Sequence, residues 1–431
     1  MTPNEYADII SVLRREVVPA IGCTEPVAVA LCVAKAREIL GREPERLDVA
    51  LSPNIYKNAM GVGIPNTGMT GLPIAVALGA TIGRSELALE VLRDTTPEAV
   101  EAAKRYMAEA AIRIDIDRAT DKILYIRVEA AAGDDVAVAE IADSHTHFTA
   151  LMLNGEPLAS GERDEVATSE AEADEGLGLT LRRVYEFATT VPLADVEFMW
   201  QAAELNIAAA EMSFGGDYGH GLGRLLHEKA SGTIFGDTLF TQILSYTSGA
   251  CDARMSGAMV PVMSNSGSGN QGISATVPVV VFARANNVER DQLLRALVLS
   301  HLTVIYIKES LGRLSALCGG VVAATGSSCG ITYLMGGDYE QVTYAVKNMV
   351  ANITGMICDG AKPSCSLKVT SGVATAVLSA ALAMEHRHTS SLEGIIDDDV
   401  DCCIRNMTSI GRSGMRETDR LILEIMTSKK R

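Results

Sequence analysis

The sequence predicts an α+β protein, in which an N-terminal mixed α/β domain (residues 1–176) precedes a mostly α-helical domain (residues 177–431). In the first part, runs rich in Val and Ile stand beside a helical pattern, whereas long apolar segments at helical spacing follow one another in the second. Residues 161–176 are acidic and almost without large apolar side chains, which is typical of a solvated linker or long loop. We therefore place the domain boundary near them.

The individual elements follow from periodicity. The first is a helix over residues 27–40, VAVALCVAKAREIL. The predicted strands are 46–52, 111–116, 122–130 and 136–142. The main predicted helices of the second part are 196–212, 290–311, 339–356 and 371–386. Some of them carry apolar residues on nearly every face, so we expect buried central helices.

Composition limits the classes of partner. The chain has 431 residues of which 48% are hydrophobic, enough for two sizeable cores. Its formal charge of -17 would repel phosphate backbones and anionic membrane surfaces, so we expect no nucleic-acid and no membrane partner. Small molecules and other subunits remain, and a homodimer is left open.

Three features of the sequence favour a cytoplasmic location. The first 18 residues contain early acidic side chains and no long apolar run, so no signal peptide is expected. No apolar stretch reads as long and Gly-poor enough to span a bilayer. Nine cysteines, an odd number, favour reduced thiols that are available for metal or catalysis over disulfides.

The motif GCTEP, residues 22–26, places a cysteine at the start of the first helix. Thr24 is a good N-cap type, Glu25 adds an acidic residue to the first turn, and Pro26 suits a helix start. The helix dipole favours negative charge at this end, which would lower the pKa of the Cys23 thiol and populate the thiolate. The alternative is a small buried cysteine that only packs, as we expect for Cys32.

Four further cysteines are close together in the second part: Cys318, Cys329, Cys358 and Cys365. Each stands beside glycine, serine or proline, which predicts turns rather than mid-helix positions. Thiolates in such turns suit an iron-sulfur cluster or zinc, although the C-x6-C pair has no standard zinc-finger spacing. The alternative is that small residues let helices pack tightly.

Two glycine-rich stretches are candidate anion sites, residues 63–71 (GIPNTGMTG) and 263–272 (MSNSGSGNQG). Glycines and hydroxyl residues let backbone N–H groups converge on a carboxylate or phosphate, although ordinary glycine loops share this composition. In SHTHF, His145 and His147 would lie on the same side of a presumed strand, and neither alone argues for a metal.

Taken together and in this order, GCTEP, SPNIYKNAMGVGIPNTGMTG, SHTHF, GSGNQGISATVPVV, SALCGG and CDGAKPSCSLK resemble the L-cysteine desulfidase family over most of the chain. That family is related through its helical domain to the iron-sulfur L-serine dehydratases. The resemblance implies an oxygen-sensitive lyase with a [4Fe-4S] cluster and no pyridoxal phosphate. It implies that Cys318, Cys358 and Cys365, spaced C-x39-C-x6-C, hold the cluster and that Cys23 is the catalytic base. Cys329 is not matched to a ligand of that family, and a fourth thiolate from it is left open.

The implied reaction is β-elimination of L-cysteine to pyruvate, ammonia and hydrogen sulfide, and L-serine would lose water by the same route. A base in the first domain and a cluster in the second would place the site at the domain interface. The candidate residues for binding the substrate carboxylate are Thr67, Gly68, Gly71, Ser268, Asn270 and Gln271, with Asn58 and His145 as further polar contacts.

Two other classes of protein compete with this interpretation. A pyridoxal phosphate lyase would bind phosphate in SGSGNQG and use Lys362 or Lys308 for the Schiff base. A non-catalytic redox or metal sensor would use the vicinal pair Cys402 and Cys403, or the cluster, to report oxidation.

Overall fold

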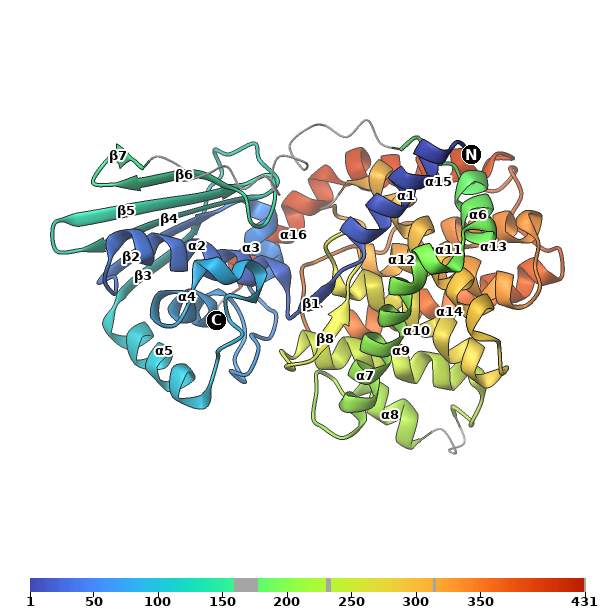
Figure 1. The fold of residues 1–431 in the computed structure, drawn as a ribbon, viewed down its shortest axis with the longest axis horizontal. Coiled ribbons are helices and arrows are strands. Elements are labelled where there is room, and N and C mark those ends of the chain that lie inside the picture. Colours follow the sequence, from blue (N-terminus) through green and yellow to red (C-terminus); the bar gives the residue numbers. More distant parts are fainter. Residues whose placement is uncertain (159–176, 230–233, 313–314, 430–431) are drawn as a thin grey trace.

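The computed structural model describes residues 1–158, 177–229, 234–312 and 315–429, which form two lobes (Figure 1). One lobe is a six-stranded sheet with helices and the other is built almost entirely of helices, so the predicted α+β class is confirmed. The predicted acidic linker, residues 161–176, lies outside the described residues. The predicted domain boundary stays a prediction.

The sheet of the first lobe has the strand order β3-β2-β4-β5-β6-β7. Its strands are β2 (Arg46–Leu51), β3 (Ala111–Ile116), β4 (Tyr125–Ala132), β5 (Asp135–Ala142), β6 (Phe148–Leu153) and β7 (Glu156–Pro157). β2 and β3 are parallel and the other neighbours are antiparallel. In β2 the buried positions Leu47, Val49 and Leu51 alternate with more exposed ones, because successive side chains of a strand point to opposite faces. The four strands predicted from the sequence are confirmed.

Helices cover one face of this sheet (Figure 1). They are α2 (Thr24–Leu40), α3 (Pro53–Ala59), α4 (Leu72–Thr81), the short 3-10 helix η1 (Ser85–Glu90) and α5 (Pro97–Glu109). α2 lies against β4 and β5 and is buried along most of its length, as its apolar sequence predicts. Cys32 is fully buried there and its thiol donates to the carbonyl of Ala139 at 3.3 Å, so it packs as expected.

The second lobe is helical. Its elements are α1 (Pro3–Glu16), α6 (Leu181–Thr190), the 3-10 helix η2 (Leu193–Met199), α7 (Trp200–Phe214), α8 (Leu222–Glu228), α9 (Leu239–Met255), α10 (Gly269–Ala285), α11 (Arg290–Leu311), α12 (Gly319–Leu334), α13 (Tyr339–Ile353), α14 (Cys365–Met384), α15 (Val400–Ser409) and the π-helical turn η3 (Ile410–Gly414). The predicted helices are confirmed, and the segment 196–212 is divided between η2 and α7.

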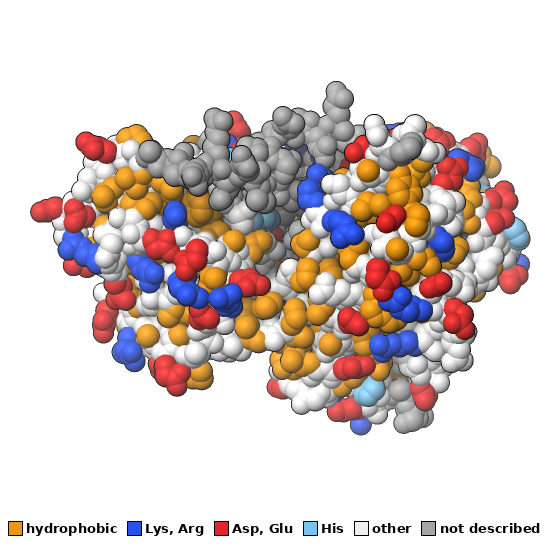
Figure 2. Space-filling view, viewed as in Figure 1, with side chains coloured by type: hydrophobic (Ala, Val, Ile, Leu, Met, Phe, Trp, Pro, Cys, Tyr) orange, Lys and Arg blue, Asp and Glu red, His pale blue; other side chains and the backbone are white. Residues whose placement is uncertain are grey.

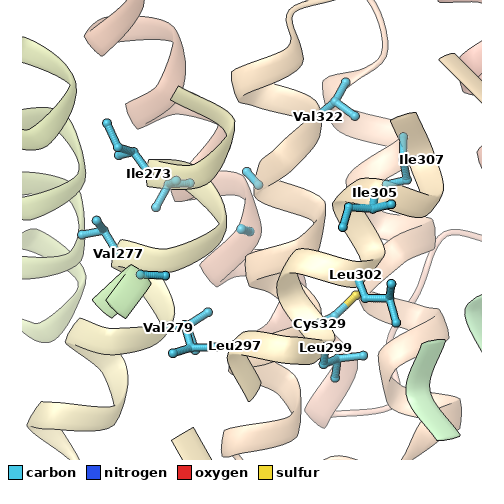
Figure 3. Packing of buried hydrophobic residues seen from close by; sticks show 14 of the residues in the cluster. Ile273, Val277, Val279, Leu297, Leu299, Leu302, Ile305, Ile307, Val322 and Cys329 are labelled. Atoms are coloured by element: carbon cyan, nitrogen blue, oxygen red, sulfur yellow. The ribbon is translucent and has the colours of Figure 1, made fainter. Parts of the chain in front are cut away.

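The core of this lobe lies between α10, α11 and α12 (Figure 3). Small residues let α12 approach its neighbours closely. At Gly326 a Cβ atom would lie 2.2 Å from the carbonyl oxygen of Ser300 on α11, so any side chain there would push the two helices apart.

The chain crosses between the lobes at both ends. α1 packs on the helical core through Ile9 and Leu13. The strand β1 (Pro19–Ile21) then pairs antiparallel with β8 (Pro261–Met263), the strand just before α10. This pairing fixes the start of α2 against the loop that leads into α10.

The last helix, α16 (Arg416–Ser428), returns to α3 of the first lobe. There Asp419 forms an ion pair with Lys57, whose side chain is 2% exposed. The two lobes are therefore joined by backbone pairing near the N-terminus and by a partly buried ion pair near the C-terminus.

By length and composition alone, one helix of the described chain is apolar enough to cross a membrane, which corrects the sequence expectation. It is α14, with a mean hydropathy of 1.5 over a window that is 39% buried. A single such helix is weak evidence, because a core helix passes the same test. On the face shown in Figure 2, Lys and Arg are mixed with Asp and Glu.

Candidate active site

A cavity of about 540 Å³ is lined by residues from both lobes. Of the residues predicted from the sequence, its lining contains Cys23, Asn58, His145, Ser268, Asn270, Gln271, Cys318, Cys358 and Cys365. The fold thus brings together residues that lie more than 300 positions apart in the chain.

Cys23 is the N-cap of α2, in extended conformation, and it is 3% exposed. The prediction that Thr24 caps the helix is wrong, because the helix begins at Thr24 and no side chain caps it. The Thr24 hydroxyl donates instead to the carbonyl of Gly267 at 3.3 Å. This bond connects the start of α2 to the loop before α10.

The structure opposes the predicted low pKa of Cys23. Burial and the negative charge of Glu25 raise the pKa of the thiol well above its usual value, and the positive charge of Arg254 only partly offsets them. The Cys23 thiol donates a hydrogen bond to Glu25 Oε2 at 3.0 Å. The helix dipole is too small to compensate for the burial of a thiolate beside a carboxylate.

Glu25 is the immediate partner of this thiol, and sequence reasoning treated it only as a helix-start residue. Asn58 on α3 donates to Glu25 Oε1 at 3.1 Å, so the amide fixes the carboxylate with its second oxygen toward Cys23. Chemically, Cys23, Glu25 and Asn58 form a chain in which a proton can pass between sulfur and oxygen. The signal for Glu25 was its spacing of two residues from the cysteine in GCTEP.

Three cysteines of the helical lobe also line the cavity. Cys318 is the N-cap of α12, Cys365 is the first residue of α14, and Cys358 lies in the loop between α13 and α14. The bridge between Leu317 and Ile357, with a bond from the Cys358 amide to the Ala316 carbonyl at 2.7 Å, holds two of these segments together. As predicted, none of the three lies in the middle of a helix, but only Cys318 and Cys358 lie outside the helices, because Cys365 is the first residue of α14.

The surroundings of these thiols suit a cluster with negatively charged ligands. Burial and the neighbouring Cys358 raise the pKa of Cys318 to about 12, so binding of a metal group would have to release protons. Two helix N-termini supply positive dipole ends at the cavity, and Lys368 adds a charge that favours the Cys318 thiolate. Gly319, Gly320 and Gly360 also line the cavity.

In the described residues, no three His, Cys, Asp or Glu side chains are grouped so that they could bind one metal ion. A cluster needs more widely spaced ligands than a single metal ion does, because each thiolate binds its own iron atom. Cys318, Cys358 and Cys365 are three thiols on the wall of one cavity.

Cys329 is placed differently from the sequence prediction. It lies in the middle of α12, not in a turn, and it is fully buried near Leu302 (Figure 3). The adjacent glycine and serine residues that predicted a turn serve close helix packing instead. Cys329 does not line the cavity, and burial raises its pKa to about 12.

We therefore expect Cys329→Ser to retain iron, sulfide and turnover, because the side chain is remote from the cavity. The cost is limited to stability, since a hydroxyl replaces a buried thiol. Metal analysis and thermal unfolding of the variant test this expectation, and loss of the cluster with an intact fold would contradict it.

The loop with Thr67, Gly68 and Gly71 does not line the cavity. The Thr67 hydroxyl closes its own turn, because it donates to the Ile64 carbonyl at 2.7 Å and accepts from the Met69 amide. At Gly71 a Cβ atom would lie 2.7 Å from the carbonyl oxygen of Met60. Gly71 is explained by this tight packing and Gly68 by its positive φ of 63°, so their predicted role in substrate binding has no support from the structure.

His145 lines the cavity from the turn between β5 and β6. The presumed strand over SHTHF is wrong, because residues 143–146 form bends and turns and the next strand begins at Phe148. His147 contacts the Ala142 carbonyl through Nδ1 at 3.3 Å and is outside the cavity lining.

Of the residues that the competing interpretations use, only some line the cavity. Lys308 on α11 lines the cavity, whereas Lys362 is outside the lining and forms an ion pair with Asp359 at 2.7 Å. Cys402 and Cys403 lie on α15, also outside the lining.

The cavity also contains Arg254, which sequence reasoning missed entirely. It is 4% exposed at the end of α9. No local motif marks it, and only the packing of α9 against α10 brings it to the cavity.

The cavity thus joins the Cys23-Glu25 pair of one lobe to three cysteines of the other. The chain belongs to the serine dehydratase alpha chain family, whose model matches residues 86–424. This membership indicates a lyase and points to an iron-sulfur cofactor. Cys23, Glu25 and Asn58 precede the matched residues.

Relatives named UPF0597 protein are similar to the chain along its full length. The chain is 62% identical to the one from Bacteroides fragilis over 429 residues, which is 100% of both chains. It is 61% identical to the one from Bacteroides thetaiotaomicron, covering 100% of this chain and 99% of that protein. It is 44% identical to the one from Oleidesulfovibrio alaskensis, covering 100% of both. These names state no activity.

Proposed function

We propose that the protein is a [4Fe-4S]-dependent L-cysteine desulfidase, which eliminates sulfide from L-cysteine to give pyruvate, ammonia and hydrogen sulfide. One observation carries this proposal: the Cys23-Glu25 pair of one lobe lines the same cavity as Cys318, Cys358 and Cys365 of the other lobe. The family membership supports a lyase with an iron-sulfur cofactor.

Cys318, Cys358 and Cys365 would hold the cluster. When bound by three thiolates, such a cluster supplies one iron with an open position, which acts as a Lewis acid toward the leaving group. Asp359 supports this wall of the cavity: burial opposes its ionisation, but hydrogen bonds from Lys362 and Lys368 outweigh burial and lower its pKa to about 2. The aspartate therefore stays charged and holds both lysines near the thiols.

Cys23 and Glu25 would remove the Cα proton. The resting thiol is protonated, so Glu25 accepts its proton and the resulting thiolate takes the proton from Cα. Asn58 keeps the carboxylate oriented during both transfers. The electrons of the Cα–H bond then form the Cα–Cβ double bond as the Cβ–S bond breaks, and the released aminoacrylate hydrolyses to pyruvate and ammonia.

Ser268, Asn270 and Gln271 would line the substrate-binding part of the cavity at the start of α10. The partner is thus a small amino acid, and we propose a cytoplasmic location and leave a homodimer open.

The direct test of this function is anaerobic purification, followed by iron and acid-labile sulfide analysis and measurement of pyruvate release from a panel of β-substituted amino acids. Iron and sulfide with pyruvate release support the proposal. Activity that requires pyridoxal phosphate would favour a Schiff base on Lys308, and iron without any turnover would favour a sensor.

L-cysteine is expected to be the better substrate, with a higher kcat/KM than L-serine. The family name favours the second candidate function, an L-serine dehydratase that uses the same residues. Thiol and hydroxyl differ little in size, so pocket shape gives weak discrimination. Parallel measurement of kcat/KM for both amino acids decides between the two functions, and a higher value for L-serine would reverse the assignment.

A further inference from the structure

A buried cation without a carboxylate partner lies at the cavity. Arg254 is 4% exposed and forms no ion pair with any residue that the structure describes. Its Nη1 donates to Asn270 Oδ1 at 3.0 Å, but its Nε is buried and has no hydrogen-bond partner. Because an unpaired buried charge is unfavourable, this position calls for a bound anion.

The guanidinium lies against the N-terminus of α10. At Gly269, the first residue of this helix, a Cβ atom would lie only 2.2 Å from Arg254 Nε. Ser268 is the N-cap and its side chain caps no backbone N–H, so donors of the first turn remain available. A helix N-terminus of this kind attracts anions, and here a buried positive side chain stands beside it.

Gln271 also lines the cavity and also has a buried polar atom without a hydrogen-bond partner. Its side chain is 4% exposed and its Oε1 has no hydrogen-bond donor. A Cβ atom at Gly319 would lie 3.1 Å from Gln271 Nε2, so the amide sits beside the residue that follows Cys318. An unsatisfied acceptor near a carboxylate site suits the ammonium group of an α-amino acid.

We propose that Arg254 and the first-turn N–H groups of α10 bind the carboxylate of an α-amino acid, while Gln271 Oε1 accepts from its ammonium group. This inference deepens the proposed function and rests on it for the identity of the substrate. Arg254 and Cys23 line the same cavity. A carboxylate on Arg254 therefore brings the adjacent Cα toward Cys23.

The test compares binding of L-alanine and L-alaninamide to the anaerobically purified holoenzyme by calorimetry. L-alanine has no leaving group, and in the amide an NH2 group replaces one carboxylate oxygen, which removes the negative charge. We expect Arg254→Gln, which keeps a donor for Asn270, to weaken L-alanine binding by roughly 10- to 150-fold and to abolish the preference over the amide. Arg284→Gln is the control, because it removes an exposed charge from the C-terminal end of α10, the helix whose N-terminus Arg254 contacts.

Thermal unfolding separates binding from a structural role. Without ligand, Arg254→Gln should unfold at the wild-type temperature or above it, because an unpaired buried charge is removed. A structural arginine would show a lower unfolding temperature and unchanged selectivity. If the glutamine variant fails to fold, Arg254→Lys keeps the charge but loses the planar fork, and unchanged L-alanine affinity in that variant would overturn the proposal.

Failure of the subsite and failure of the proposed function give different results. Binding of L-alanine that depends on Arg254, without pyruvate release from cysteine or serine, would retain the subsite and reject the desulfidase. Turnover of L-cysteine with an unchanged KM in Arg254→Gln would retain the enzyme and reject the subsite.

Discussion

Cys358→Ser is expected to abolish retention of iron and sulfide together with all measurable turnover. A serine hydroxyl stays protonated near neutral pH and is a poor ligand for iron of a cluster, so two thiolates would remain where three are needed. Cys358 lies in a loop and is only partly buried, unlike Cys318, so the substitution should leave the fold intact. Iron and acid-labile sulfide are measured on protein purified without oxygen, and thermal unfolding is followed in parallel.

Cys402→Ser is the matched control for this variant. It makes the same substitution at another partly buried cysteine, on α15 and outside the cavity lining. The control should keep wild-type iron and activity. Full iron and sulfide in Cys358→Ser would show that this cysteine does not bind the cluster.

The sequence predicted elements whose signal is local. The helix over residues 290–311 has the same bounds as α11, and the strands of the sheet were found from their Val and Ile alternation. α12 was not predicted, because its Gly, Ala and Ser residues carry no amphipathic pattern and its stability comes from close packing in the core. Cys329 was assigned to a turn for the same reason.

Two glycine loops of similar composition had different outcomes. The loop at Ser268 lines the cavity, whereas the loop at Thr67 closes on itself. The pairing of β1 with β8, a contact between residues far apart in the sequence, places the strand before the Ser268 loop beside the segment that leads to Cys23. Arg254 was missed because its role depends on tertiary contacts that no motif records.

The local argument for Cys23 identified the position correctly and the electrostatics incorrectly. A helix N-terminus lowers a thiol pKa when the thiol is solvated and free of acidic neighbours. Here burial and Glu25 reverse the direction of the shift. The residue that opposes ionisation is also the one that accepts its hydrogen bond, which makes the pair, rather than the thiol alone, the unit that handles the proton.

Cys23→Ser is expected to lower turnover by roughly 10²- to 10⁴-fold, the usual effect of losing a general base, while iron, sulfide and fold are retained. Serine keeps a similar volume and can still donate to Glu25, but its hydroxyl is far too weakly acidic to replace a thiolate. Measurement of kcat and of iron on the same preparation separates the possible roles. A ligand would lose iron together with activity, and a residue that only packs would leave activity near the wild-type value.

Glu25→Gln tests whether the two side chains act as one unit. The amide keeps the size of the carboxylate and a hydrogen bond with Asn58, but it cannot accept the thiol proton. We expect kcat to fall by a similar factor, with iron retained and with no further loss in the Cys23→Ser, Glu25→Gln double variant, because groups that act together give non-additive losses. Additive losses would mean that Glu25 acts elsewhere, for instance on the ammonium group of the substrate, and that Cys23 loses its proton to another acceptor. Wild-type kcat in Glu25→Gln would show that the hydrogen bond only holds the thiol in its resting position.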